Sequence, residues 1–151
     1  MKACRRVAYL LDVNVLIART DPRHEYHNAV SAWLDGVGGE PLLVCPLVEN
    51  GFLRIYGHPS YPGGPGSPEK AAVDLRDILK LSNADFIPDT ISIRDSGVFI
   101  SLAGLSPRQL NDVYLLGLAA SRGARFATLD GRIPTAAVRG GEAALQVIPK
   151  Q

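Results

Sequence analysis

Short apolar runs alternate along this chain with longer segments in which apolar residues recur every three or four positions. The runs are nearly continuous, which is typical of parallel strands that are buried on both faces. Five such strands are predicted: Val7–Leu11, Leu42–Val44, Phe86–Ile87 with its flanks, Arg125–Leu129 and Leu145–Ile148. Because helical segments separate these strands, the pattern predicts an α/β fold built on a central parallel sheet.

Four segments between the strands have helical spacing. Their apolar stripes consist of Ala29, Trp33 and Leu34; Val48, Phe52 and Ile55; Val73, Ile78 and Leu81; and Val113, Leu116, Ala119 and Ala120. The third helix is predicted to open at Ser67 and Pro68, an N-cap followed by proline at the first helical position. The fourth is predicted to end before Gly123, because glycine suits the left-handed position that follows a helix.

Size and composition fit one domain spanning residues 1–151. Hydrophobic residues make up 46% of the chain and charged residues 21%, the balance of an ordinary globular protein. The segment Gly57–Ser67 is rich in proline and glycine, and we expect a surface loop there. The chain contains 16 Lys and Arg and 15 Asp and Glu, so its net charge of +1 provides no broad electrostatic attraction for nucleic acid. Any nucleic-acid chemistry must therefore come from a local site.

Cysteine usage and the N-terminus indicate a cytoplasmic protein. Cys4 and Cys45 have neither metal-ligand spacing nor the density of a disulfide scaffold, so we expect buried free thiols. The apolar run behind the basic N-terminus is interrupted at Asp12 and Asn14. It is too short for a signal peptide, which needs about 7–15 apolar positions, or for a membrane span, which needs about 20. No membrane association is expected.

Two predicted strands run directly into an aspartate. Asp12 follows Val7–Leu11, and Asp130 follows Arg125–Leu129. Ligands of open α/β sheets bind beyond the carboxyl ends of the strands. If these strands are neighbours, both carboxylates lie at the same rim, within reach of one metal ion. Asp12 could instead simply cap the following helix, and Gly131 would suit an ordinary turn after Asp130.

Two further acids fall within predicted helices. Asp112 opens the apolar helix that contains Val113, and by itself it is favoured as a structural cap because the helix dipole stabilises a carboxylate at this end. Glu49 is flanked by apolar residues and would be costly to bury without a partner. Metal coordination, a salt bridge to Arg54 and simple exposure are equally open for Glu49.

Together the four acids suit a hard cation. Mg²⁺ takes one or two protein carboxylates and keeps waters and phosphate oxygens in its other positions, and a pair of such ions can promote cleavage of a phosphodiester. Zinc would prefer paired His and Cys ligands. His24 and His27 are three positions apart on a predicted helix, but no third ligand lies nearby. A packing or surface role is therefore expected for both histidines.

These motifs resemble the PIN-domain nucleases and, more narrowly, the VapC toxins of bacterial toxin–antitoxin pairs. The resemblance covers nearly the whole chain. Its motifs are Leu-Leu-Asp-Val-Asn-Val-Leu-Ile-Ala around Asp12, Val-Glu-Asn-Gly-Phe-Leu-Arg around Glu49, Asn-Asp-Val-Tyr-Leu-Leu-Gly-Leu-Ala around Asp112, and Ala-Thr-Leu-Asp before Gly131. Any one of these motifs alone would be weak, whereas the ordered set is fairly specific.

The resemblance implies a three-layer sandwich with a five-stranded parallel sheet flanked by helices. It also implies an endoribonuclease that depends on Mg²⁺ or Mn²⁺, inhibition by a VapB-type antitoxin, a homodimer, and a heterotetramer or larger assembly with the antitoxin. Asp12, Glu49, Asp112 and Asp130 match the family's catalytic and metal-binding acids. Thr128 matches a position that supports the last acid, and Asn14 a polar neighbour of the first.

This chain departs from the family after the last acid. Many relatives carry a further acid and an aromatic residue there, whereas this chain has Gly131, Arg132 and Ile133. The number of metal ions is therefore left open. Arg132 and Arg54 are candidates for contact with an RNA phosphate, with exposure to solvent as the simpler interpretation of each.

Two functions other than a ribonuclease are compatible with parts of this sequence. A phosphatase of the haloacid-dehalogenase kind also places an aspartate after its first strand, but it needs a second acid two residues later, where this chain has Asn14, and a lysine near the site. No lysine lies between Lys80 and Lys150. The other alternative is a catalytically idle PIN-like module that binds RNA or protein. The identity of the RNA is not encoded in any of these motifs.

Overall fold

The computed structural model describes residues 6–151, so the predicted thiol of Cys4 lies outside the described residues. The elements in chain order are β1 (Tyr9–Leu11), α1 (Val13–Thr20), α2 (His27–Gly36), β2 (Leu42–Val44), α3 (Pro46–Tyr56), α4 (Pro68–Leu81), β3 (Asp85–Phe86), the 3₁₀ turn η1 (Pro107–Gln109), α5 (Leu110–Ser121), β4 (Arg125–Thr128), the 3₁₀ turn η2 (Thr135–Ala137), α6 (Gly141–Ala144) and β5 (Leu145–Val147). All five predicted strands are confirmed, each within about two residues of its predicted ends.

The strands form one five-stranded sheet in the order β3-β2-β1-β4-β5, and every pairing is parallel. The central strand β1 is buried along its whole length, as is its neighbour β2. This explains why their sequences are continuously apolar, since both faces of such a strand are covered. The predicted α/β fold is therefore confirmed.

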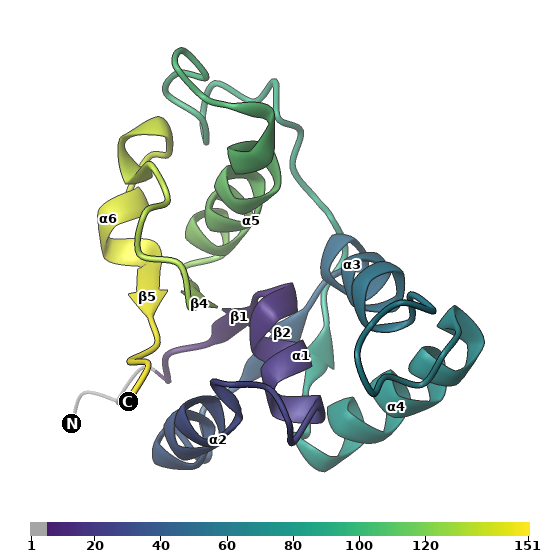
Figure 1. The fold of residues 1–151 in the computed structure, drawn as a ribbon. Coiled ribbons are helices and arrows are strands. Elements are labelled where there is room, and N and C mark those ends of the chain that lie inside the picture. The colour runs from purple at the N-terminus through teal and green to yellow at the C-terminus, as the bar shows by residue number, and fades with distance from the viewer. Residues whose placement is uncertain (1–5) are drawn as a thin grey trace, which may run out of the picture.

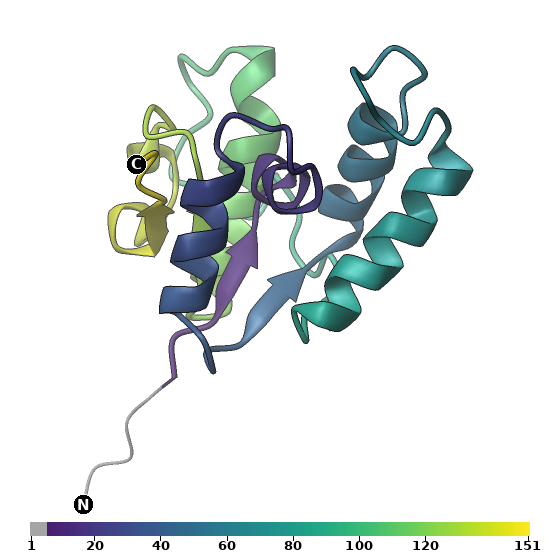
Figure 2. The same cartoon turned by 60° about the horizontal axis from the view of Figure 1, so that its bottom comes forward.

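Helices cover both faces of the sheet and give the predicted three layers. Figures 1 and 2 agree in placing α2 on one side of β1 and β4 and α5 on the other. Helix α6 packs beside α5, and α3 and α4 lie side by side near β2 and β3. Phe52, Phe126 and Leu10 are among the largest fully buried side chains of the core.

The predicted helix signals hold, but some apolar positions were assigned to the wrong face. Ser67 Oγ accepts a hydrogen bond from the backbone N–H of Lys70, and Gly123 adopts a φ of 67° just past α5. By contrast, Val73 and Leu81 of α4 are exposed, at 48% and 82%. Helix α4 buries Ala71, Leu75 and Ile78, so the predicted stripe was right for Ile78 and wrong for Val73 and Leu81. Ile55 of α3 is also exposed, at 40%.

Two irregular segments are fixed by contacts distant in sequence. The predicted loop Gly57–Ser67 has no helix or strand, and Tyr61 within it donates its hydroxyl hydrogen to Asp21 Oδ2 over 2.7 Å. Residues 87–106 run from β3 across to α5 (Figure 1), and Phe99 pairs with Val138 in an isolated antiparallel bridge. Within residues 6–151, no helix has the length and apolar character that crossing a membrane requires.

Candidate active site

The position of Asp12 after β1 suggested either a cap of the next helix or a carboxylate at the rim of the sheet, and Asp12 is both. Its carboxylate is 95% buried; Oδ1 accepts from the backbone N–H of Val13 over 2.7 Å, which caps α1, and Oδ2 accepts from the hydroxyl of Thr128, also over 2.7 Å. Burial raises the pKa of Asp12, while the hydrogen bonds from Thr128 and Val13 oppose that rise. Capping of α1 therefore occupies only one oxygen of Asp12. The carboxylate is held in a fixed orientation at the rim of the sheet.

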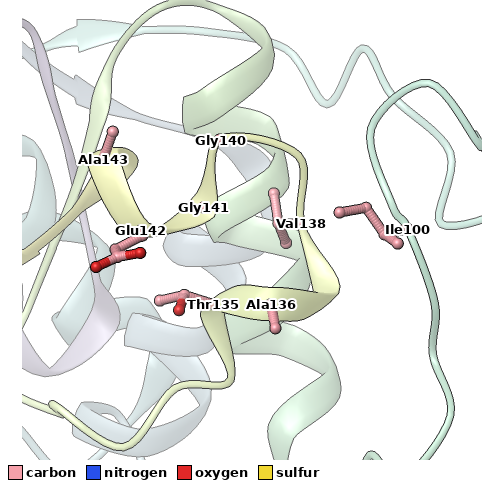
Figure 3. Close-up of a pocket in the computed structure, with 8 residues that line it drawn as sticks. All are labelled: Ile100, Thr135, Ala136, Val138, Gly140, Gly141, Glu142 and Ala143. Carbon is pink, nitrogen blue, oxygen red and sulfur yellow. The ribbon is translucent and has the colours of Figure 1, made fainter.

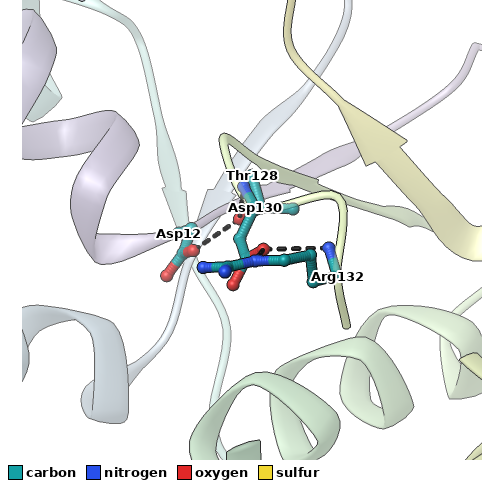
Figure 4. A network of polar contacts seen from close by, with 4 residues as sticks. All are labelled: Asp12, Thr128, Asp130 and Arg132. Carbon is teal, nitrogen blue, oxygen red and sulfur yellow. Dashed lines mark hydrogen bonds and ion pairs between the residues drawn. The ribbon is translucent and has the colours of Figure 1, made fainter. Parts of the chain in front are cut away.

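Strand β4 brings the second predicted strand-end acid to the same rim. β1 and β4 are neighbours, with Leu11 opposite Ala127, and Asp12 N–H donates to the Ala127 carbonyl over 3.0 Å. The hydroxyl of Thr128 donates to Asp12 and accepts from the backbone N–H of Asp130 over 3.1 Å. One buried side chain thus sets the positions of both acids, as Figure 4 shows.

Asp112 lies in the first turn of α5, close enough to the other two acids for their charges to act on it. Burial, followed by the charges of Asp12 and Asp130, raises the pKa of Asp112 to about 6. The interpretation of this residue as a helix cap was wrong, because the N-cap position of α5 is Gln109 and no side chain accepts a capping hydrogen bond there. The helix dipole favours a charge at this end, but burial and two like charges outweigh it.

Glu49 has different surroundings. It lies in the first turn of α3 and is half-buried, and burial is the cause of its raised pKa; the charges of the other three acids contribute nothing resolvable. Among residues 6–151 the sole ion pair joins Arg132 to Asp130, so Glu49 and Arg54 do not form one. Helix α3 does approach α1 closely, because a Cβ at Gly51 would lie only 2.7 Å from Val13 Cγ2.

Arg132 pairs with one of the acids, Asp130. Its backbone N–H donates to Asp130 Oδ1 over 2.9 Å, and its Nε lies 3.4 Å from the same oxygen. The side chain contacts Asp130, as Figure 4 shows, and is nevertheless 93% exposed. Arg54 and Asn14 are exposed as well, which keeps all three available to a ligand.

Two hollows flank the pair formed by Asp130 and Arg132. One, of about 380 Å³, also reaches Asp112 and Arg108. The other, of about 460 Å³, is lined by Asn14 and by Lys150 near the end of the described chain. Arg108 and Lys150 are cations that sequence reasoning missed, since nothing in their local sequence indicates proximity to the acids.

A third hollow, of about 570 Å³, lies away from the acids. Figure 3 shows it between Ile100 and the segment that includes η2 and the start of α6. Glu142 supplies the charge among its described lining residues, and none of the four predicted acids reaches it. It is therefore not part of the candidate active site.

The two histidines have local partners, as expected. His24 was predicted to lie within a helix, but α2 begins only at His27. The Nδ1 of His24 accepts from the backbone N–H of Tyr26 over 3.1 Å, and the Nδ1 of His27 lies 2.7 Å from the Ala18 carbonyl oxygen. These contacts organise the turn before α2.

The acids fit a hard cation by their chemistry. All are oxygen donors, the kind of ligand that Mg²⁺ prefers, and the pKa of Asp112 shows that three of the carboxylates already oppose one another electrostatically. A cation relieves this repulsion. As the side chains stand, residues 6–151 contain no group of three His, Cys, Asp or Glu arranged to hold a metal.

The sequence is similar to those of known proteins. Residues 9–138 match the sequence model of the PIN domain. Ribonuclease VapC44 of Mycobacterium tuberculosis is 38% identical over 134 residues, which covers 87% of this chain and 92% of that protein. Ribonuclease VapC39 of the same organism is 30% identical over 131 residues, covering 87% and 94%.

A solved structure shares the fold. A chain in the crystal structure of VapBC2 from Rickettsia felis, bound to a DNA fragment from their promoter, superposes with a TM-score of 0.51. The superposition covers 85% of this chain and 94% of that chain at 15% sequence identity, so it is a likeness of fold alone.

Proposed function

This chain belongs to the PIN-domain family, and from that premise we propose that it is a metal-dependent endoribonuclease, the toxin of a toxin–antitoxin pair. The similarity to proteins named Ribonuclease VapC supports the reaction class. The observation that carries the proposal is the gathering of Asp12, Asp112 and Asp130 at one rim, where their charges act on one another. The family match leaves the haloacid-dehalogenase alternative without support.

Asp12, Glu49, Asp112 and Asp130 are the residues that would hold Mg²⁺ or Mn²⁺. When bound, such an ion supplies an activated water and neutralises charge that develops on the phosphodiester. The chain's own contribution is orientation, because Thr128 fixes one oxygen of Asp12 and the backbone of Asp130. Arg132 offers its remaining guanidinium N–H groups to a substrate phosphate, while Arg54 and Asn14 are further contact candidates.

We propose a VapB-type antitoxin as the partner, with a homodimer of this chain in a heterotetramer or larger assembly. The fold neighbour from Rickettsia felis comes from a VapBC2 structure, which supports this choice. An antitoxin tail with an arginine directed at the acids should block cleavage. Substituting the basic residues of that tail should restore cleavage at unchanged toxin concentration; full inhibition by the substituted tail would place the block elsewhere.

The central experiment measures cleavage of end-labelled RNA by purified protein in Mn²⁺, Mg²⁺ or EDTA. Asp12→Asn should reduce cleavage by more than the roughly 10–100-fold typical of a residue that only supports a metal ligand. Asp77→Asn, which alters an exposed acid on α4, is the matched control and should cleave like the wild type. Wild-type cleavage by folded Asp12→Asn protein would refute the carboxylate mechanism. A wild type that binds RNA but never cuts it would favour the idle module.

A further inference from the structure

A pocket beside the acids combines aromatic rings with cations. This hollow of about 460 Å³, called the Tyr26 pocket below, has Asp130 and Arg132 on one wall. His24, Tyr26 and Lys150 come from parts of the chain far from them in sequence, and Asn14 adds an amide. A chain with a net charge of only +1 thus concentrates two cations at one pocket next to its acidic site.

The ring of Tyr26 lies close to two other side chains of this pocket. Lys150 Nζ lies 5.3 Å from the ring centroid, and the His24 ring centroid lies 5.9 Å from it. Aromatic rings flanked by cations are the usual recognition elements for single-stranded nucleic acid, because every base has a face that stacks and every linkage has a phosphate. An apolar ligand would not require the two cations, and a simple anion would not require the rings.

The polar groups of the pocket are oriented and have free donors. Because His24 Nδ1 accepts from the Tyr26 N–H, the neutral ring carries its proton on Nε2, which is left available to donate. Arg132 uses Nε on Asp130 Oδ1 and keeps its terminal nitrogens free. The same contact offsets the charge of Asp130, which would otherwise repel a phosphate.

Hydrogen bonds to Asp21 hold the turn that carries His24 and Tyr26 against the rest of the protein. Asp21, which is buried, accepts from the backbone N–H of Arg23 with Oδ1 and from the Tyr61 hydroxyl with Oδ2. The backbone N–H of His24 also donates to the Asp21 carbonyl over 3.1 Å. A turn held in this way keeps the rings in position before a ligand arrives, which lowers the entropic cost of binding.

The Tyr26 pocket continues a path across the acids. Asp130 and Arg132 also border the second hollow, which contains Asp112 and Arg108. An RNA strand that lies over the acids would therefore contact Arg108 on one side of them and the Tyr26 pocket on the other side. Lys150 lies beyond residues 9–138, so the family match does not extend to this cation.

We propose that the Tyr26 pocket binds one nucleotide of single-stranded RNA, adjacent to the phosphate that is cut. Its base packs against Tyr26 and His24, and its phosphate contacts Arg132 and Lys150. This inference rests on the proposed ribonuclease function and adds a substrate requirement: the base must be free of a duplex, since a stacked and paired base cannot enter.

A binding experiment tests the pocket without any cleavage. Nucleoside 5′-monophosphates are titrated into metal-free protein in EDTA while NMR follows the imidazole signals, with His58 and His27, which do not line the pocket, as internal references. A saturable shift of the His24 signal is expected, about 10-fold weaker in Tyr26→Ala and nearly unchanged in Tyr26→Phe, which keeps the ring. Inorganic phosphate should shift it far less. Equal responses from wild type and folded Tyr26→Ala, or no saturable His24 response, overturn the proposal.

A cleavage experiment separates this proposal from the one it rests on. Lys150→Gln and Tyr26→Ala should raise KM for a short single-stranded RNA by about 10-fold, with kcat within about threefold of wild type. Lys80→Gln, at an exposed lysine of α4 outside the pocket, is the matched control and should behave as wild type. If the wild type cuts RNA while both pocket variants retain its KM, the pocket proposal fails and the ribonuclease stands. If no protein cuts RNA, the ribonuclease proposal fails, and the NMR titration alone decides the pocket.

Discussion

Replacing Asp112 with asparagine should stabilise the metal-free protein at neutral pH. The pKa of Asp112 is raised from 3.8 to about 6, first by burial and then by the charges of Asp12 and Asp130. A carboxyl group that holds its proton more tightly in the folded chain than in the unfolded chain lowers stability as the pH rises between those two values. The cost is absent below about pH 4 and complete above about pH 6.

The size of this cost follows from the pKa difference. Two units correspond to about 3 kcal/mol at 1.36 kcal/mol per unit. Asp112 is only partly buried, so solvent screening reduces the figure to about 1–2 kcal/mol. Asparagine has nearly the same shape and no charge, so Asp112→Asn should recover this amount. For a chain of this length that corresponds to a rise in melting temperature of about 2–8 °C.

Urea and thermal unfolding in EDTA between pH 4 and pH 8 provide the measurement. The gain of Asp112→Asn over wild type should grow from near zero at pH 4 to its full value at pH 8, while Asp77→Asn, at an exposed acid, should show no such trend. Mn²⁺ at a hundredfold excess over Kd should stabilise the wild type by about 2.7 kcal/mol and Asp112→Asn by less. A gain that is equal at both pH values, or a loss at pH 8, would refute the reasoning.

Three further substitutions test the contacts around the acids. Thr128→Val removes the hydroxyl that orients Asp12, so unfolding free energy should fall by about 1–3 kcal/mol and kcat/KM by about 10–100-fold, with recovery in Thr128→Ser. Gly51→Ala forces a Cβ into the side chain of α1 that it faces and should cost about 1–3 kcal/mol in chemical denaturation, whereas Gly36→Ala, with open space around it, should not destabilise. Tyr61→Phe loses the hydroxyl that fastens the Gly57–Ser67 loop, which should lower stability by about 1 kcal/mol and increase proteolysis of that loop.

The sheet and the meeting of the strand-end acids could be predicted because both depend on rules local to a strand. A strand covered on both faces must be apolar throughout, which made Leu42–Val44 recognisable from its own residues. Asp12 and Asp130 directly follow such strands, and a parallel sheet brings its carboxyl ends to one edge. The family resemblance placed Asp112 with them, whereas its helix position alone had favoured a cap.

What could not be predicted depends on contacts between distant segments. The residues between β3 and α5 have no helical or alternating pattern, and their path is set by pairing such as that of Phe99 with Val138. The exposure of Val73 depends on which face of α4 meets α3, and several faces of that helix carry apolar residues. Lys150 reaches the Tyr26 ring only through the course of the chain after β5. A single sequence contains no signal for that proximity.

The strand order has a consequence for the chain while it is being synthesised. β1 lies at the centre of the sheet, yet its partner β4 is synthesised much later, because Thr128, whose hydroxyl orients Asp12, comes 116 positions after that residue. At about 5–20 residues per second, roughly ten seconds of translation lie between the two residues. During that interval Asp12 lacks both Thr128, which orients its carboxylate, and Asp130. The proposed site therefore stays incomplete until β4 has paired with β1, and we expect the nascent chain to cleave no RNA before then.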